Sequence, residues 1–361
     1  MDGESMDDET VVVLAVQLAA LTCIAGSLLL YLLCKIRGGR RLEYDAEFTS
    51  LNVGTGRSVL VTSAESAFGL QLVLHLSALG FRVFAGFRAG ESGAAGATAD
   101  GYHAEADCEA ARVLRAKMKA RQALVEARVA GVEESGVVRG SIVTLPLDVN
   151  REDVLHEAVG IIRRHLPAGE DGLWGVINTA GLCIKGKLEV QDLTQWDAML
   201  KTNVIGLLRC ARTFMPLLRT KKGRLLTIGT GMEMGSGCVA YCAARHAVVG
   251  ASAALAQELH PHGIHVITLQ PDTIPSEKLF AKPKICTSSS ETSSSERYLK
   301  CNVEVVPATA MQTIEEALLT VSPKTLYHLA SPSPLSNYIA AITDRFTHAH
   351  DKKVVAASTH I

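Results

Sequence analysis

The sequence predicts an α/β protein whose core is a doubly wound parallel sheet with helices on both faces. Short apolar runs alternate with segments of helical spacing along most of the chain. The runs are apolar throughout, which is typical of parallel strands that are buried on both faces. The first repeat comprises a strand at 58–62, a helix at about 68–79 and a strand at 82–85, the size of one parallel crossover unit.

The alternation continues through the second half of the chain. We expect strands at 142–147, 173–178, 224–229 and 264–270, and helices at 154–165, 194–218 and 241–258. The segment 194–218 is either one long helix or a pair of helices. A chain of 361 residues is long enough for one large α/β domain with additions.

Two segments interrupt the alternation. Residues 90–140 begin with small residues and continue, from 104 to 129, with good helix formers such as Ala, Glu, Lys and Leu. We expect an exposed helical insertion there, without chemistry of its own. The serine-rich segment 286–297 has low complexity and is expected to form a mobile loop. It follows the carboxyl end of a strand, so either a substrate lid or a plain surface insertion is consistent with it.

A long apolar segment near the N-terminus predicts a membrane anchor at 11–35. Its apolar run extends from 11 to 34 and is interrupted only by Gln17, Thr22, Gly26 and Ser27. As a helix the segment is about 36 Å long, which is enough to cross a hydrocarbon core of about 30 Å. Acidic residues precede it and basic residues follow it, so the positive-inside rule places the rest of the chain in the cytosol. The alternative is a buried helix of a soluble domain.

Composition excludes several functional classes. The net charge of −1 does not favour nucleic-acid binding, which requires an excess of basic residues. The nine cysteines form no Cys-x-x-Cys pair, so neither a disulfide framework nor a zinc site is indicated. Histidines such as His260 and His262 stand in no ligand pattern, and we expect no metal site.

The turn between the first strand and the first helix is a candidate phosphate site. Main-chain N–H groups and the positive end of a helix dipole meet there, as pyrophosphate binding requires. Two positions that would normally be glycine are Ser63 and Ala67. Taken alone, this composition favours an ordinary strand-to-helix turn. The candidate contacts in the turn are Thr62, Ser63, Ser66, Ala67, Phe68 and Gly69.

A tyrosine and an arginine stand one helical turn apart in the expected helix 241–258. Tyr241 and Arg245 share a helix face because residues four apart are neighbours on a helix. A cation beside the phenol would lower the tyrosine pKa from about 10 and make it a usable acid or base. The pattern Tyr-x-x-x-Arg is common by chance, so its position among the other motifs carries the argument.

Six motifs in order resemble the short-chain dehydrogenase/reductase family, from about residue 57 to 344. The nearest branch is that of the retinol, hydroxysteroid and 3-hydroxybutyrate dehydrogenases, and a narrower likeness is to an insect steroid-hormone enzyme. The matching segments are 62–69 with the strand after it, Leu147-Asp148-Val149, Asn178-Thr-Ala-Gly181, Asn203-Val-Ile-Gly206, Tyr241-Cys-Ala-Ala-Arg245, and Ser322-Pro-Lys-Thr-Leu-Tyr327.

The resemblance implies a Rossmann-type domain at 57–345 that binds NAD or NADP. The residues before it would be an acidic N-terminus at 1–10, the anchor at 11–35 and a linker at 36–56, and a tail at 346–361 would follow. Besides the turn at 62–69, the implied cofactor contacts are Arg88, Asp148, Val149, Asn178, Ala180, Gly181 and Pro271. Arg88 can favour the 2′-phosphate of NADP, although an exposed loop arginine is the simpler interpretation.

The resemblance also implies catalytic roles. Tyr241 would be the acid or base, Arg245 would lower its pKa and hold the nicotinamide ribose, and Asn203 would hold a water molecule. Thr230 would position the substrate oxygen, with Thr227 as the fallback. Arg245 replaces the family's lysine and cannot relay a proton. Asp272 replaces a glycine and would put a carboxylate near the nicotinamide side.

These features predict a membrane-anchored oxidoreductase that interconverts hydroxyl and carbonyl groups on a small hydrophobic substrate, such as a steroid, a retinoid or another lipid alcohol. The alternative is a catalytically impaired dehydrogenase-like protein that binds a ligand or a partner. We expect the endoplasmic reticulum membrane, with a mitochondrial membrane as the alternative, no nucleic-acid partner, and a homo-oligomer as an option. Trp174 is expected to lie near the pocket.

Overall fold

The computed structural model describes residues 17, 22, 26–27, 53–88, 108–129, 140–230, 237–272, 274–284 and 294–329. The four described residues before position 53 are helical and exposed. The rest of the expected anchor, the linker at 36–52, most of the serine-rich segment and the tail at 346–361 lie outside the described residues, so the anchor stays a prediction. The chain divides into two compact units, Met1–Val53 and Gly54–Ile361, and the second carries the fold.

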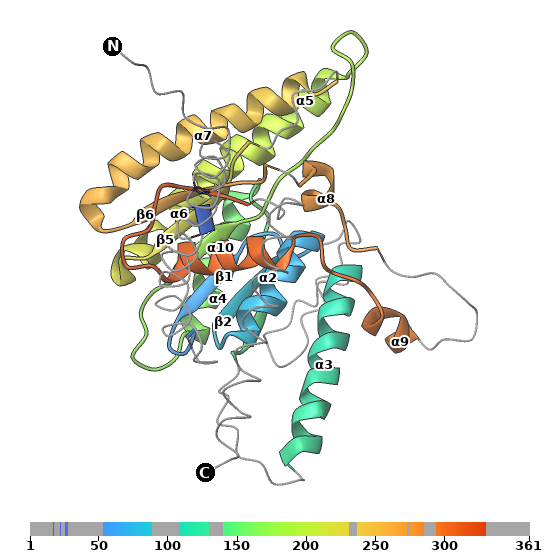
Figure 1. Cartoon of the computed structure of the whole chain (residues 1–361), viewed down its shortest axis with the longest axis vertical. Coiled ribbons are helices and arrows are strands. Elements are labelled where there is room, and N and C mark those ends of the chain that lie inside the picture. The colour runs from blue at the N-terminus through green and yellow to red at the C-terminus, as the bar shows by residue number, and fades with distance from the viewer. Residues whose placement is uncertain are drawn as a thin grey trace, which may run out of the picture. The chain divides into compact units, whose positions relative to one another are not determined.

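Within the described residues, seven strands form one parallel sheet in the order β3-β2-β1-β4-β5-β6-β7 (Figure 1). The strands are β1 (Ser58–Val61), β2 (Arg82–Phe87), β3 (Ile142–Pro146), β4 (Gly175–Asn178), β5 (Arg224–Ile228), β6 (His265–Gln270) and β7 (Leu326–His328). The predicted doubly wound parallel sheet is therefore confirmed.

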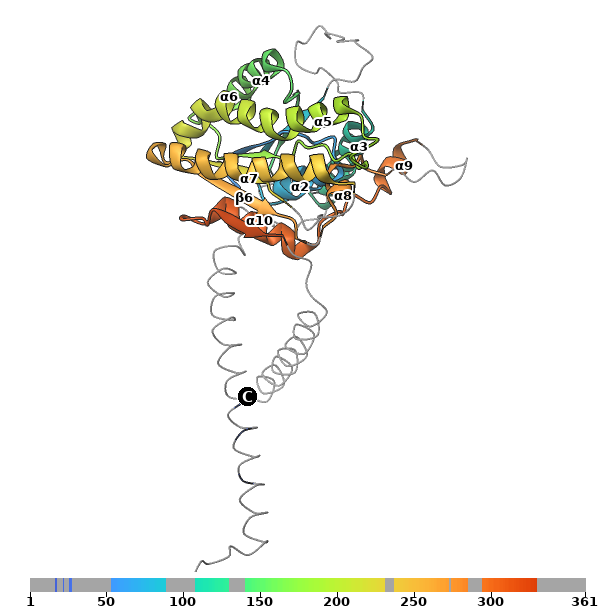
Figure 2. The same ribbon diagram turned by 90° about the horizontal axis from the view of Figure 1, so that it is seen from above.

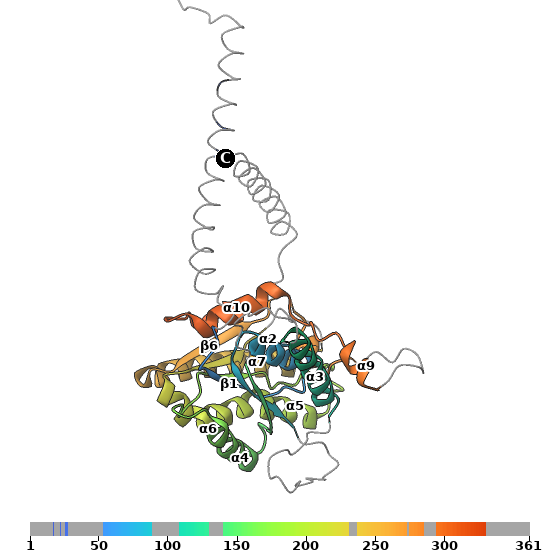
Figure 3. The same ribbon diagram turned by 90° about the horizontal axis from the view of Figure 1, so that it is seen from below.

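Helices cover both faces of this sheet. One core lies under α2 (Ala67–Ala78), α3 (Glu109–Val129) and α10 (Ala308–Leu319), and the other lies under α4 (Glu152–His165), α6 (Gly206–Lys221) and α7 (Val239–Leu259). Figures 2 and 3 show α4 and α6 on one side of the sheet and α10 on the other. The short helices are α5 (Leu193–Leu200), α8 (Ser276–Phe280) and α9 (Ser294–Leu299).

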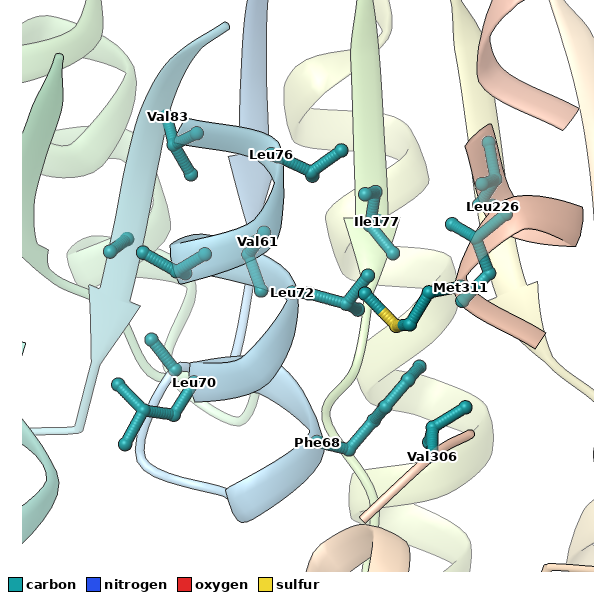
Figure 4. Packing of buried hydrophobic residues seen from close by; sticks show 14 of the residues in the cluster. Val61, Phe68, Leu70, Leu72, Leu76, Val83, Ile177, Leu226, Val306 and Met311 are labelled. Atoms are coloured by element: carbon teal, nitrogen blue, oxygen red, sulfur yellow. The ribbon is translucent and has the colours of Figure 1, made fainter. Parts of the chain in front are cut away.

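Neighbouring strand residues point alternately into the two cores. In β1, Val61 packs in the core under α2, whereas Leu60 packs in the opposite one. Phe68 and Leu72 of α2 reach Met311 of α10 in the same core, as Figure 4 shows. Because both faces of each central strand are buried, the strands need the unbroken apolar runs that predicted them.

Helix α3 corrects one expectation. The segment 90–140 was expected to be an exposed insertion, but Ala110, Ala111, Val113 and Leu114 are buried against the sheet. The helix runs between β2 and β3, which are parallel neighbours and therefore need a crossover connection. The error arises because small alanines on a narrow buried face, surrounded by charged residues, look like a solvated helix. The other residues of 90–140 lie outside the described ranges.

The C-terminal elements α8, α9, α10 and β7 were not predicted from the sequence. Helix α10 buries Met311, Ile314 and Leu318, and the last motif of the resemblance, 322–327, leads into β7. Among the described residues, one stretch, Val239–His262, is long and apolar enough to cross a membrane. It contains α7, which packs beside β6 and contributes to the core, so we assign it to the α/β domain.

The burial of α3 predicts a stability effect that an exposed insertion would not show. Leu114→Ala should lower the free energy of unfolding by about 2–5 kcal/mol, because it leaves a cavity in the core. Arg115→Ala, at the next and exposed position, should change it by less than about 0.5 kcal/mol. Urea unfolding of the full-length protein in detergent measures both. Equal small effects would show that α3 does not belong to the core.

Candidate active site

The predicted site residues gather at one edge of the sheet. The carboxyl ends of β1, β4 and β5 meet there, because the strands are parallel neighbours, and the first turns of α2 and α7 lie beside them (Figure 1). This edge is where open α/β sheets bind ligands.

The turn after β1 is hydrogen-bonded to the end of β4. The hydroxyl of Thr62 donates to Oδ1 of Asn178 at 2.9 Å and accepts the main-chain N–H groups of Thr179 and Ala180 at 3.2 and 3.3 Å. The main-chain N–H of Ser63 donates to the Thr179 hydroxyl at 3.1 Å. Two predicted cofactor segments, 62–69 and 178–181, therefore form one rigid unit.

At the start of α2, protein atoms already accept some of the main-chain N–H groups that a phosphate would use. Ser66 caps the helix, because its Oγ accepts the N–H of Gly69 at 3.0 Å. A Cβ on Gly69 would lie 1.9 Å from the carbonyl oxygen of Ser63, so only glycine fits at this position. The N–H of Ala67 donates to the carbonyl oxygen of Ala281 at 2.8 Å. Two helix-start N–H groups are thus already bonded to the protein, and a phosphate would have to use the others or displace Ala281.

Three of the four predicted catalytic residues meet around a buried guanidinium group. Nε of Arg245 donates to the Tyr241 hydroxyl at 3.2 Å, Nη1 donates to the Ile228 carbonyl oxygen at 3.0 Å, and Nη2 donates to Oδ1 of Asn203 at 3.3 Å. Arg245 is 2% exposed. The arginine therefore joins the end of β5, the first turns of α7 and the segment that carries Asn203.

Asn203 lies in a π-helical turn, Lys201–Ile205, between α5 and α6. Such turns are rare in proteins overall, but those that occur lie frequently at functional sites. The side-chain amide accepts the N–H of Leu182 at 2.8 Å and donates to its carbonyl oxygen at 2.9 Å. In this arrangement Asn203 fixes the segment after β4 against Arg245, while its expected role in holding water stays a prediction.

The pKa of Tyr241 differs in direction from the expectation. The Arg245 cation lowers it, but burial of the phenol outweighs the cation and raises the pKa above its ordinary value of 10.0. The expectation considered only the charge four residues away and not the loss of solvent around the hydroxyl. The phenol is protonated near neutral pH, as an unperturbed tyrosine would be, and burial makes it a weaker acid than an exposed tyrosine.

The two candidate threonines are placed differently. Thr227 is fully buried in β5 and its hydroxyl lies 3.0 Å from Oγ of Ser252, about 16 Å further along α7 than Tyr241. This fallback position is therefore occupied by a core hydrogen bond. Thr230 is half-buried just beyond β5 and next to residues 231–236, which lie outside the described residues, so its expected role stays a prediction.

Helix α8 brings a residue to the site that the sequence did not single out. The Phe280 ring centre lies 4.5 Å from the guanidinium carbon of Arg245. A Cβ on Gly181 would lie 2.3 Å from Cε1 of Phe280, so the ring packs directly on that glycine. Glu277 of the same helix pairs with Lys185 at 3.1 Å, after β4. Phe280 thus lies on one face of Arg245, the residue that the family resemblance assigns to the nicotinamide ribose.

The remaining predicted residues lie around these groups. Asp148 accepts the N–H of Asn150 at 2.8 Å. Val149 is buried close to Gly206, where an added Cβ would lie 2.8 Å from Cγ2 of Val149.

Pro271 is buried at the end of β6. Asp272 pairs with His328 at 2.6 Å, which gives its carboxylate a partner on β7. Whether these residues contact a cofactor stays a prediction.

Trp174 corrects another expectation, since it does not lie near the pocket. It precedes β4 and therefore stands at the opposite, amino-terminal edge of the sheet. Its ring lies between the guanidinium groups of Arg57 and Arg224, whose central carbons are 4.4 and 4.2 Å from the ring centre. Its fluorescence is therefore a poor reporter of binding at the carboxyl edge. Within the described ranges, no group of three or more His, Cys, Asp or Glu side chains could hold a metal ion.

Comparison with known proteins gives one family. A family model described as short chain dehydrogenase matches residues 109–281. Rat mitochondrial D-beta-hydroxybutyrate dehydrogenase is 28% identical over 237 residues, which cover 65% of this chain and 59% of that enzyme. Rat estradiol 17-beta-dehydrogenase 2 is 29% identical over 220 residues, which cover 60% of this chain and 47% of that enzyme. Mouse retinol dehydrogenase 7 is 28% identical over 129 residues, or 36% of this chain and 40% of that enzyme.

A solved structure agrees with the fold. A short-chain dehydrogenase from Streptomyces avermitilis superposes with a TM-score of 0.50 at 21% identity, over 84% of this chain and 98% of that protein. At this identity the likeness concerns the fold alone. The chain spans 59% of the length of the hydroxybutyrate dehydrogenase that it matches, so that enzyme's activity is not transferred with the alignment.

The turn after β1 gives a sharp test of the site's packing. Gly69→Ala should lower the free energy of unfolding by more than about 2 kcal/mol, because the new Cβ collides with the Ser63 carbonyl oxygen. Gly250→Ala is the matched control, since a Cβ there meets nothing within 4 Å on helix α7. It should raise stability by roughly 0.5–1 kcal/mol through helix propensity. Thermal unfolding measures both, and an equal effect of the two changes would contradict this geometry.

Proposed function

Because the chain belongs to the short-chain dehydrogenase/reductase family, in the branch of the hydroxybutyrate, hydroxysteroid and retinol dehydrogenases, we propose that it is an NAD(P)-dependent oxidoreductase. The reaction is the interconversion of a hydroxyl and a carbonyl group. The observation that carries the proposal is the buried contact of Tyr241 with Arg245, next to Asn203, at the carboxyl edge of the sheet. The named activities of the relatives are those of dehydrogenases.

The residues of the site fit a dinucleotide at one end. At the ends of β1 and β2, Oε2 of Glu65 is a buried oxygen without a hydrogen-bond partner among the described residues, which is what a polar ligand would satisfy. The turn after β1 and the segment 178–181 are held together beside it. At the other end Phe280 lies on Arg245 and must move if that face is to hold a ribose.

The residues of this chain supply the proton and the electrostatic support. The dinucleotide, when bound, supplies or accepts the hydride. The protonated Tyr241 hydroxyl donates its proton to the oxygen of a carbonyl substrate, and the Arg245 cation stabilises the phenolate that remains. Arginine does not release a proton, so the phenolate is reprotonated by another route than the family's lysine.

A second function is favoured by the protein contacts of Arg245. All three guanidinium nitrogens donate to protein atoms, and Phe280 covers one face of the group. An arginine with these contacts is a structural residue, and the chain would then be a dehydrogenase-like protein that binds a ligand or a partner without hydride transfer. The two hypotheses predict different effects of replacing Tyr241. Loss of its hydroxyl would impair the function only if the protein is an enzyme.

The substrate class and the cellular setting extend the proposal. A hydrophobic alcohol such as a steroid or a retinoid suits the apolar segment 11–35, which would keep the site near a membrane, in the endoplasmic reticulum or in mitochondria. The domain would face the cytosol. A homo-oligomer is supported by exposed apolar side chains on α5 and the helices beside it, namely Leu193, Leu200, Ile205, Leu208, Val239 and Val249.

The enzyme reading makes Tyr241 indispensable. Tyr241→Phe should lower turnover by about 10²–10⁴-fold, the usual contribution of an acid/base group, on whichever substrate of a steroid, retinoid and hydroxy-acid panel is active. Tyr298→Phe, which also removes one phenolic hydroxyl, is the control and should leave turnover unchanged. Activity that survives Tyr241→Phe would refute the mechanism.

The pH dependence should differ between the two directions. Carbonyl reduction needs the phenol, so it should persist from neutral pH to about pH 10, since the pKa of Tyr241 is raised. Alcohol oxidation needs the phenolate, so its rate should climb with pH through that range. Profiles of kcat/KM in the two directions measure this. An oxidation rate that is already level at neutral pH would mean that the phenolate forms more easily than burial allows.

The contact of Phe280 with Arg245 should oppose cofactor binding. Phe280→Ala should tighten binding of the preferred dinucleotide roughly 2- to 30-fold, because a cation–π contact worth roughly 0.5–2 kcal/mol no longer has to be broken. Phe280→Leu should show a smaller gain, since it keeps the apolar cover without the ring. Calorimetric titration of the full-length protein measures both. Weaker binding in Phe280→Ala would mean that the ring supports the cofactor instead of competing with it.

A further inference from the structure

A carboxylate and a guanidinium group from two neighbouring strand ends meet beside the first turn of α2. Glu65 belongs to the turn after β1, and Arg88 follows the last residue of β2. The two strands are parallel neighbours, with Val61 opposite Ala85. Oε1 of Glu65 lies 3.7 Å from Nη2 of Arg88, which is an ion pair but too long for a hydrogen bond.

The pair leaves one carboxylate oxygen without a hydrogen-bond donor. Oε2 of Glu65 is buried and has no hydrogen-bond partner among the described residues. The Glu65 side chain is 20% exposed, whereas the Arg88 side chain is 55% exposed. Burial raises the pKa of Glu65, although a hydrogen bond from its own main-chain N–H, the Arg88 charge, the Ser63 hydroxyl and the Arg88 main-chain N–H lower it. A buried carboxylate oxygen without a donor is costly, so a donor from outside the protein would be stabilised there.

This oxygen lies where the adenosine ribose of a dinucleotide is bound in sheets of this kind. In dinucleotide-binding sheets, the pyrophosphate lies at the first helix, and an acidic group near the end of the second strand accepts a hydrogen bond from the adenosine ribose. Here β2 ends in Gly86 and Phe87 and is followed by Arg88, so none of these three positions supplies an acid. Glu65 brings one to the same place from the turn, because its carboxylate reaches Arg88.

We propose that Glu65 accepts a hydrogen bond from the 2′-hydroxyl of the adenosine ribose and thereby selects NAD over NADP. The inference rests on the proposed function, in which a dinucleotide binds along this edge. A 2′-phosphate in place of the hydroxyl would set a second anion beside the Glu65 carboxylate, with Arg88 as their shared cation. It would also offer no donor to Oε2, since an ionised phosphate only accepts. The expectation that Arg88 favours NADP overlooked this carboxylate.

The test compares three dinucleotides on the full-length protein in detergent, by calorimetric titration. The unmodified protein should bind NAD at least about tenfold more tightly than NADP, and more tightly than the NAD analogue that lacks the adenosine 2′-hydroxyl. These measurements do not depend on whether any variant folds.

The variant Glu65→Gln then removes the charge with little change of shape. It should weaken NAD, strengthen NADP and bring the ratio of the two dissociation constants towards one. Glu258→Gln is the matched control, because it removes one acidic charge from an exposed position near the other end of α7 and should leave the ratio unchanged. Thermal unfolding of both variants verifies that they are folded.

The outcomes separate the inference from the proposed function. Tighter binding of NADP than of NAD, or a ratio that Glu65→Gln leaves unchanged, overturns the role of Glu65 while dinucleotide binding itself stands. An undiminished affinity for the 2′-deoxy analogue also overturns it. Absence of binding of all three dinucleotides overturns the proposed function, and the inference with it. NAD preference that falls in Glu65→Gln but not in Glu258→Gln supports both.

Discussion

The geometry of the site depends on one buried cation, Arg245, which requires hydrogen-bond acceptors from the protein. Arg245 is removed from solvent, and its described hydrogen bonds go to neutral acceptors, namely the Tyr241 hydroxyl, the Ile228 carbonyl and the Asn203 amide. A buried charge is tolerated only when hydrogen bonds replace its lost hydration. The forked geometry of the guanidinium group lets one side chain make three such bonds in different directions. A lysine in its place could not span the same three acceptors in the same way.

The same burial sets the chemistry of the tyrosine. Cation and desolvation act on Tyr241 in opposite directions, and desolvation is the larger effect. The phenol is kept neutral, while the charge that would support its conjugate base is held one helical turn away. Burial therefore makes the phenolate harder to form, and the Arg245 cation offsets this only in part. This property follows from packing and is invisible in the spacing of the two residues.

Local pattern and motif order predicted the parallel sheet except β7, most of the helices on it and the meeting of Tyr241 with Arg245, because these depend on periodicity and on spacing along one helix. The features that were missed depend on contacts between distant segments. Glu65 meets Arg88, and Ala67 meets Ala281, across gaps that no local pattern records. Helix α3 was misjudged because burial of small alanines gives little hydrophobic signal. Trp174 was misplaced because the direction of its strand was not considered.

The two ends of the proposed site differ in how far their polar groups already have partners in the protein. This difference bears on whether the protein only binds a dinucleotide or also turns over a substrate. At the adenosine end, the Glu65 carboxylate retains an unpaired oxygen, so the protein leaves room for a polar partner. At the end proposed for the nicotinamide, each guanidinium nitrogen of Arg245 donates one hydrogen bond to the protein, and Phe280 lies on its face. Under the proposed function, the free energy of moving Phe280 off Arg245 would then separate an enzyme from a protein that only binds a ligand.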